Sequence, residues 1–146
     1  MDNFALEISD LRKVYSGGTE ALKGISLKVK EGDFYALLGP NGAGKSTTIG
    51  IIGTLVTKTS GTVKIFNHDI DQNVSIAKSI LGVVSQELNF SQFEKVIDIV
   101  TTQAGFYGIP KSVAKPKVEI MLKRLGLWDK RDDQARTLSG GYKRRL

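Results

Sequence analysis

The sequence has 146 residues, 40% of them hydrophobic, which is enough for one domain with a real core, or for one domain and a small insert. Its apolar runs are too short to span a bilayer, and the absence of cysteine excludes disulfides and thiolate metal sites. The net charge of +6 is dispersed apart from residues 143–145, and no RNA-binding aromatic signature or zinc-finger spacing occurs, so we expect no nucleic-acid partner.

The first thirty residues predict two half-buried strands joined by a turn. Residues 5–14 alternate loosely between apolar and polar side chains, and Ile25, Leu27 and Val29 alternate with polar neighbours. Residues 15–19, Tyr-Ser-Gly-Gly-Thr, are typical of a turn. We therefore expect a small antiparallel sheet that leans on the segment that follows.

The stretch from Gly39 to Thr47, GPNGAGKST, fits the phosphate-binding loop pattern G-x-x-x-x-G-K-[ST]. A continuous apolar run at residues 34–38 precedes it and predicts a strand buried on both faces. After it, one side of a helix that starts at about Lys45 is predicted by Thr48, Ile51, Ile52 and Leu55. A strand, a glycine-rich loop and a helix in this order predict nucleotide binding.

Each residue type in the loop suits a triphosphate. Gly42 and Gly44 permit the positive φ angles and the close approach that turn backbone N–H groups towards phosphate oxygens. Lys45 supplies a cation for the β- and γ-phosphates, and the Ser46 hydroxyl is a ligand for Mg²⁺. The helix aims its N-terminal dipole at the same phosphates. The nucleotide-binding residues predicted in this segment are Gly39, Pro40, Asn41, Gly42, Ala43, Gly44, Lys45, Ser46, Thr47 and Thr48.

Short elements follow the first helix. Residues 62–66 predict a strand, and residues 76–81 predict a short helix. Residues 82–85 predict a brief buried strand that ends at Gln86. His68, the sole histidine, falls in a polar turn, and we expect it to be a surface residue without a catalytic role.

From about residue 90 the pattern changes to two consecutive helices. Apolar side chains repeat at helical spacing over residues 93–100 and again over residues 118–125, and Ser112 is the expected cap of the second helix. Two helices with no strand between them predict a helical subdomain. We therefore predict a nucleotide-binding core with the antiparallel β-subdomain over residues 1–89 and a helical subdomain over residues 90–146.

A second motif, Leu-Ser-Gly-Gly-Tyr at residues 138–142, lies about 95 residues after the phosphate loop. The pair of motifs resembles the ATP-binding subunits of ABC transporters, whose signature sequence is L-S-G-G-Q, with Tyr142 at the tolerant glutamine position. The resemblance runs over the whole chain and is greatest to bacterial multidrug-type exporters, in which ATPase and membrane subunit are separate chains. It implies an α/β fold, a P-loop NTPase (RecA-like) core with an N-terminal antiparallel β-subdomain and a helical subdomain.

The resemblance also implies roles for residues outside the loop. Tyr15 fits the aromatic residue that stacks on adenine, the alternative being an exposed residue at a strand end. Gln86 fits the Q-loop glutamine, which ligates Mg²⁺ or holds the attacking water and is, with the loop lysine, a candidate catalytic residue; the alternative is a polar strand terminus. In the family, the residues that match Ser139, Gly140 and Gly141 bind the γ-phosphate of ATP held by the other protomer, so ATP bridges a homodimer.

Family members continue beyond the signature with a Walker B strand, which brings a Mg²⁺-organising aspartate and the catalytic glutamate within roughly two dozen residues. The sequence stops at Leu146, and no run of four apolar residues followed by Asp-Glu occurs in it. We therefore expect a fragment truncated before the Walker B strand. It should bind ATP weakly and hydrolyse it negligibly, although its full-length parent would be an ATPase.

The implied function is the ATP-binding subunit of an ABC exporter, which couples ATP binding and hydrolysis to transport. Its partners would be a second ATP-binding subunit and an integral membrane permease subunit. The chain start lacks the features of a signal peptide, so we expect a cytoplasmic protein, peripheral on the inner face of the cell membrane. Two alternatives stay open: a soluble ABC protein of repair or translation with no membrane partner, and a regulatory module that binds nucleotide without turnover.

Overall fold

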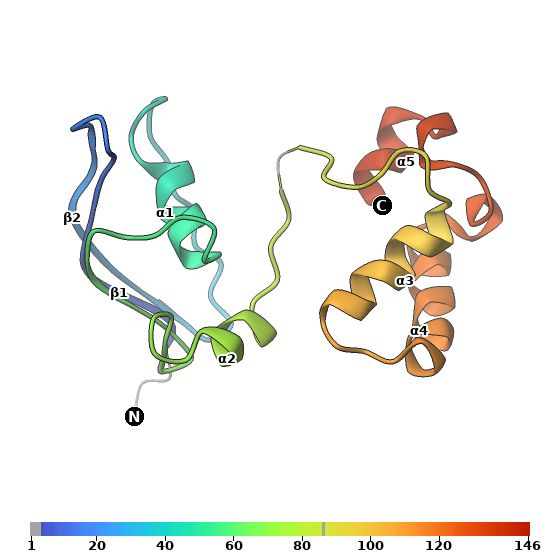
Figure 1. Cartoon of the computed structure of the whole chain (residues 1–146), viewed down its shortest axis with the longest axis horizontal. Helices are drawn as coiled ribbons and strands as arrows, with labels where there is room; N and C mark the ends of the chain where they lie inside the picture. Colours follow the sequence, from blue (N-terminus) through green and yellow to red (C-terminus); the bar gives the residue numbers. More distant parts are fainter. Residues whose placement is uncertain (1–3, 86) are drawn as a thin grey trace. The chain divides into compact units, whose positions relative to one another are not determined.

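The computed structural model describes residues 4–85 and 87–146, which fall into two units, Met1–Val83 and Val84–Leu146. The first unit contains β1 (Phe4–Val14), β2 (Glu20–Lys30), α1 (Lys45–Ile52), β3 (Ser60–Ile65), β4 (His68–Asp69) and α2 (Val74–Ser79) (Figure 1). The second unit contains α3 (Val96–Phe106), α4 (Lys111–Arg124), two 3₁₀ turns (Trp128–Lys130 and Ala135–Thr137) and α5 (Gly140–Arg145). In the described part of the chain, no helix is long and apolar enough to cross a membrane.

An antiparallel sheet with strand order β2-β1-β3-β4 is the centre of the first unit. The two predicted N-terminal strands and the third strand are confirmed, and β1 lies between β2 and β3. The hairpin between β3 and β4 turns at Phe66 and Asn67, whose φ angles are 45° and 65°, the left-handed values that tight hairpins use. His68, expected in a turn, is the first residue of β4, where it pairs with Ile65 of β3 and is half-buried.

A bend in β1 brings more of the strand to the core than simple alternation allows. Ile8 and Leu11 are both buried, although residues three apart lie on opposite faces of a regular strand. The register shifts between them, and Asp10 has a φ of 44°. At Gly61, φ is 89° and a Cβ would collide with the Asp10 carbonyl, so only glycine lets β3 pass the bend. The bend therefore returns Leu11 to the core face.

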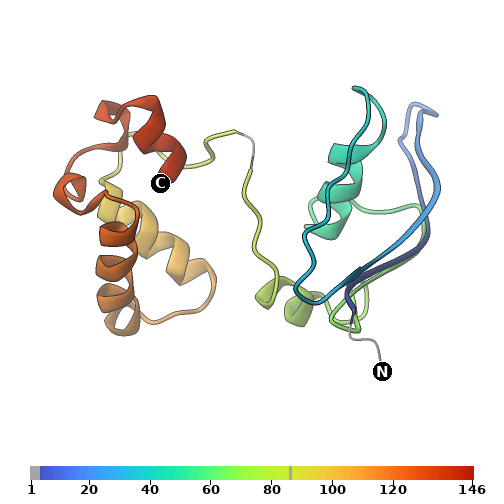
Figure 2. The same ribbon diagram turned by 180° about the vertical axis from the view of Figure 1, so that it is seen from behind.

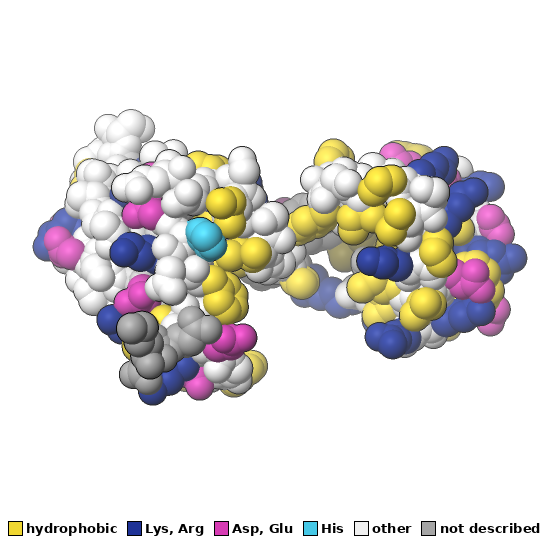
Figure 3. Space-filling model, turned by 90° about the horizontal axis from the view of Figure 1, so that it is seen from below, with side chains coloured by type: hydrophobic (Ala, Val, Ile, Leu, Met, Phe, Trp, Pro, Cys, Tyr) yellow, Lys and Arg dark blue, Asp and Glu magenta, His cyan; other side chains and the backbone are white. Residues whose placement is uncertain are grey.

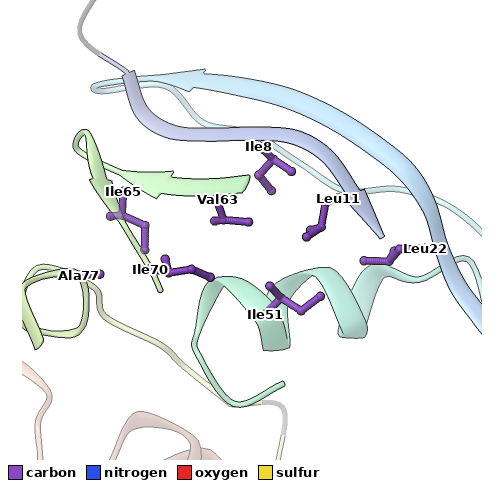
Figure 4. Close-up of a cluster of buried hydrophobic side chains, with 8 residues drawn as sticks. All are labelled: Ile8, Leu11, Leu22, Ile51, Val63, Ile65, Ile70 and Ala77. Carbon is purple, nitrogen blue, oxygen red and sulfur yellow. The ribbon is translucent and has the colours of Figure 1, made fainter. Parts of the chain in front are cut away.

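Helix α1 covers one face of the sheet. Its Ile51 has no exposed surface and points at the side chains of β1 and β3 (Figure 4). Fully burying an aliphatic side chain contributes roughly 1.5–3 kcal/mol. The helix ends at Ile52, so Leu55, predicted on its apolar face, lies outside it and is 78% exposed. The buried cluster comprises Ile8, Leu11, Leu22, Ile51, Val63, Ile65, Ile70 and Ala77.

Two predicted strands are wrong. Residues 34–38 form irregular backbone (Figure 2), with Phe34 98% and Leu38 90% exposed. Residues 82–85 are also irregular, and Val84 is 98% exposed. A strand needs a neighbour that bonds its N–H and C=O groups, and among the described residues no strand runs beside either segment. The apolar pattern alone could not reveal the lack of partners.

The second unit is built on α3 and α4. Val118 and Leu122 of the predicted apolar face are buried in α4, and Ala114 is buried one turn earlier. Met121, predicted on the same face, is 56% exposed, and Leu125 is the C-cap, so the predicted face is confirmed only in part. Pro110 is the N-cap of α4, and Ser112 is its second residue, so the predicted Ser112 cap is wrong. The unit boundary lies between Val83 and Val84. A functional division at residues 89 and 90 stays a prediction.

Charge is unequally divided between the units. The second unit holds 12 of the 21 Lys and Arg residues and 7 of the 15 Asp and Glu residues, so it carries +5 of the net charge of +6. Its basic side chains are spread over the surface, with acidic ones between them (Figure 3). Several are paired, as Lys123 is with Glu119 at 2.7 Å and Lys130 with Asp133 at 3.3 Å. This distribution is that of a solvated surface.

Candidate nucleotide-binding site

The segment from Gly39 to Gly44 turns sharply and leads into α1. Gly39, Gly42 and Gly44 have φ angles of 154°, 84° and 84°, and the Ala43 N–H donates to the Pro40 carbonyl at 3.3 Å. The residues from Gly39 to Ala43 are exposed. Such a turn, with its backbone open to solvent at a helix start, can bring several N–H groups to one anion.

Strand β2 supports the loop at Gly44. A Cβ on Gly44 would lie 2.6 Å from Leu22 Cδ2 and 2.8 Å from the Ala21 carbonyl oxygen. Gly42 has the same φ of 84°, but a Cβ there would meet nothing within 4 Å. Glycine is therefore required at position 44 both for its backbone conformation and for its contact with the sheet. The antiparallel sheet does lean on the loop, as the sequence predicts.

The start of α1 has backbone donors that no bond within the helix uses. The first helical bond joins the Thr48 N–H to the Gly44 carbonyl at 2.8 Å, and the Thr48 hydroxyl donates to the same oxygen at 2.9 Å. The N–H groups of residues 45–47 precede this bond, so the helix leaves them for another acceptor. Together with the helix dipole they favour an anion. Thr48 is among the nucleotide-binding residues predicted from the sequence. It is 2% exposed, and both of its bonds to the Gly44 carbonyl stabilise the first turn of the helix.

The Lys45 side chain folds across the loop. Its Nζ donates to the Gly39 carbonyl at 2.6 Å and to the Pro40 carbonyl at 2.7 Å. Carbonyl oxygens solvate an ammonium group but do not neutralise it. The Lys45 charge therefore remains available to a phosphate at the open side of the loop.

An aromatic ring stands beside the same helix start. Tyr15 follows β1, and its hydroxyl lies 3.4 Å from Thr47 Oγ1. The residue is 41% exposed. Lys13 Nζ lies 4.9 Å from the centre of the Tyr15 ring, a contact not predicted from the sequence. No pattern in the sequence predicts the contact, because Tyr15 lies beyond the end of β1 and so outside its alternation of faces.

The expected Mg²⁺ ligands are only partly visible. Ser46 is exposed in the first turn of α1, and Gln86 lies outside the described residues. Within the described ranges, no group of three or more His, Cys, Asp or Glu side chains could hold a metal ion. The exposed hydroxyl suits Mg²⁺ that takes most of its ligands from phosphates and water, because this ion is often bound by only one or two protein groups.

The signature residues lie at a helix start in the second unit. Ser139 is the N-cap of α5, and its Oγ accepts a bond from the Tyr142 N–H at 3.5 Å. Gly140 and Gly141 are the first two residues of α5, and both glycines and Ser139 are exposed. The phosphate loop belongs to the first unit and these residues to the second.

Comparison with known proteins gives consistent matches. Residues 22–146 match the protein family described as ABC transporter. The chain is 36% identical over 141 residues to the linearmycin resistance ATP-binding protein LnrL of Bacillus subtilis (strain 168), covering 97% of this chain and 45% of that protein. It is 35% identical over 142 residues to the daunorubicin/doxorubicin resistance ATP-binding protein DrrA of Streptomyces peucetius, covering 97% and 43%.

A solved structure shares the fold. The cbiO1 protein from Clostridium perfringens, part of the ABC transporter complex cbiONQ, superposes with a TM-score of 0.81 at 30% identity, covering 99% of this chain and 59% of that one. The antiparallel sheet with its helices is therefore that of a P-loop ABC domain. The chain spans less than half the length of the two curated relatives above.

Proposed function

The chain belongs to the ABC transporter family, and from that premise we propose that it is the ATP-binding part of an exporter subunit. The whole subunit would couple ATP binding and hydrolysis to transport across the membrane. The Lys45 ammonium carries the proposal, because it lies across an exposed loop and donates there to two carbonyl oxygens. The resistance ATP-binding proteins among the relatives support the export role.

The geometry supports a nucleoside triphosphate, and the family favours ATP. The N–H groups of residues 45–47 and the Lys45 ammonium would bind the phosphates, with Lys45 exchanging its carbonyl partners for phosphate oxygens. The Ser46 hydroxyl would hold Mg²⁺, which neutralises charge on the β- and γ-phosphates when bound. Tyr15, close to Thr47, would receive the base on its ring. Gln86 would act on the metal or the attacking water.

We extend the proposal to two partners. Ser139, Gly140 and Gly141, exposed at the start of α5, would bind the γ-phosphate of ATP held by a second copy of the subunit. ATP would then hold a homodimer closed, and its loss would open it. A membrane permease subunit would receive this motion, which would place the protein at the inner face of the cell membrane. The cbiO1 relative is itself part of a transporter complex.

Titration of the chain with a fluorescent ATP analogue and Mg²⁺ tests the nucleotide site. We expect saturable binding that Lys45→Ala weakens at least about tenfold, since a charge-assisted hydrogen bond contributes about 1.5–3 kcal/mol. Lys78→Ala, which removes an exposed lysine from α2 in the same unit, is the matched control and should bind as the unaltered chain does. Equal affinity of the two variants would contradict the proposal.

A further inference from the structure

We propose that Lys13 is a positioning residue for the nucleotide base. Its ammonium covers one face of the Tyr15 ring, and the ring is thereby held ready to receive a base on its other face. The inference rests on the proposed nucleotide site and adds a residue to it.

The Lys13 ammonium makes two contacts, one with a carbonyl oxygen and one with the Tyr15 ring. Its Nζ donates to the Thr57 carbonyl at 2.6 Å while lying 4.9 Å from the centre of the Tyr15 ring. A lysine over an aromatic face is attracted by the negative charge of the ring face. The lysine therefore links the ring to the segment that enters β3, rather than lying loosely on the surface.

The segment that supplies this carbonyl is itself bonded to β1. Thr59 donates its N–H to the Arg12 carbonyl at 2.9 Å, and its hydroxyl accepts from the Val14 N–H at 2.9 Å. The two residues of β1 that make these bonds, Arg12 and Val14, flank Lys13 in the sequence. The Thr57 carbonyl is therefore a fixed acceptor, and the position of the lysine head follows from the pairing of β1 with this segment.

The ring is held at two further points. The Tyr15 N–H donates to the Thr19 carbonyl at 3.0 Å, and the Gly18 N–H donates to the Tyr15 carbonyl at 2.8 Å, which fixes the backbone of the turn. The hydroxyl at the ring tip lies 3.4 Å from Thr47 Oγ1. Tyr15 is 41% exposed, and a flat base would stack on the ring face opposite Lys13. A ring ordered before the ligand arrives loses less conformational freedom on binding.

The test distinguishes the contribution of the base to binding from that of the phosphates. Dissociation constants for MgATP and for inorganic tripolyphosphate with Mg²⁺ are measured by calorimetry on the unaltered chain and its variants. Lys13→Met, which keeps the length and removes the charge, should weaken MgATP binding about two- to fivefold. Tripolyphosphate affinity should not change. Lys13→Arg should restore MgATP binding, since a guanidinium also lies on rings and donates to carbonyls.

Lys28→Met is the matched control, because Lys28 Nζ lies 4.7 Å from the Phe4 ring at another site on the same sheet. It should leave both affinities unchanged. Equal weakening of both ligands by Lys13→Met would overturn the inference, because it would indicate general charge attraction. So would a Lys13→Arg variant that binds no better than Lys13→Met.

Failure of the proposed function would look different. If the unaltered chain and Lys45→Ala bind tripolyphosphate equally, the phosphate loop is not the site, and both proposals are overturned. If Tyr15→Ala keeps the full preference for MgATP over tripolyphosphate, the ring is not the base platform. If Tyr15→Ala loses that preference and Lys13→Met retains it, only the role of Lys13 is overturned.

Discussion

The phosphate loop has an apolar segment on each side, and the two segments have opposite fates. On the C-terminal side, Ile51 of α1 packs on the sheet with no exposed surface. On the N-terminal side, Phe34 and Leu38 are 98% and 90% exposed. A helix satisfies its own backbone and needs only a surface to cover, whereas an extended segment also needs a neighbouring strand.

The difference shows what holds the loop in place. Its anchors are α1 and β2, because Gly44 lies against Leu22 and Ala21 and is followed at once by the packed helix. Lys45 reaches back from this side and donates to the carbonyls of Gly39 and Pro40. The groups that would bind phosphate therefore belong to the packed side of the loop.

The largest expected effect on stability comes from truncating a buried side chain on the C-terminal, packed side of the loop. Ile51→Ala should destabilise the first unit by about 2–5 kcal/mol, because it removes a fully buried side chain and leaves a cavity. Leu38→Ala, a comparable truncation on the exposed side, should change stability by less than about 0.5 kcal/mol. Hydrogen exchange of the β1 and β3 amides measures both. Equal losses of protection would contradict the contrast between the two sides.

A smaller effect is expected where the loop meets the sheet. Gly44→Ala and Gly42→Ala place alanine at the same φ of 84°, at a cost of about 1–2 kcal/mol each. Only Gly44→Ala also drives a Cβ into Leu22 and Ala21. In titrations with a fluorescent ATP analogue it should therefore weaken binding at least about tenfold more than Gly42→Ala does. Similar losses in the two variants would show that β2 does not support the loop.

Association between copies should depend on the exposed apolar segment on the N-terminal side of the loop. Extended apolar segments without a neighbour recruit other chains, so we expect the protein to self-associate at high concentration. The double change Phe34→Ser and Leu38→Ser should raise the monomer fraction in light scattering. The control is Ile120→Ser with Met121→Ser, which removes side chains that are 54% and 56% exposed on a helix. A monomeric unaltered chain at high concentration, or an equal response of the control, would refute the prediction.

The smallest effect concerns the start of a helix, where the first backbone N–H groups need an acceptor outside the helix. Ser139→Ala should destabilise the second unit by about 0.5 kcal/mol, because its capping bond of 3.5 Å is long. Ser112→Ala should have a smaller effect, since Ser112 lies inside α4. Fluorescence of Trp128, the sole tryptophan, reports urea unfolding of this unit. A larger loss for Ser112→Ala would reverse the assignment of caps.

Local patterns predicted much of this molecule, and contacts between distant residues account for the rest. Alternation predicted β1 and β2, and the glycine pattern predicted a turn that leads into a helix. The bend at Asp10 was not predictable, because it depends on Gly61 across the sheet. The exposure of residues 34–38 reflects missing neighbours. The Lys13 contact was missed because its anchor, the Thr57 carbonyl, lies 44 residues further along the chain.

The central claim is that the loop, the start of α1 and Tyr15 form one nucleotide site within the first unit. Amide chemical shifts of the ¹⁵N-labelled chain during titration with MgATP and with inorganic tripolyphosphate test it most directly. We expect tripolyphosphate to shift the amides of residues 42–47 and MgATP to shift the Tyr15 amide as well. Shifts confined to other segments, or a Tyr15 amide equally affected by both ligands, would contradict the account.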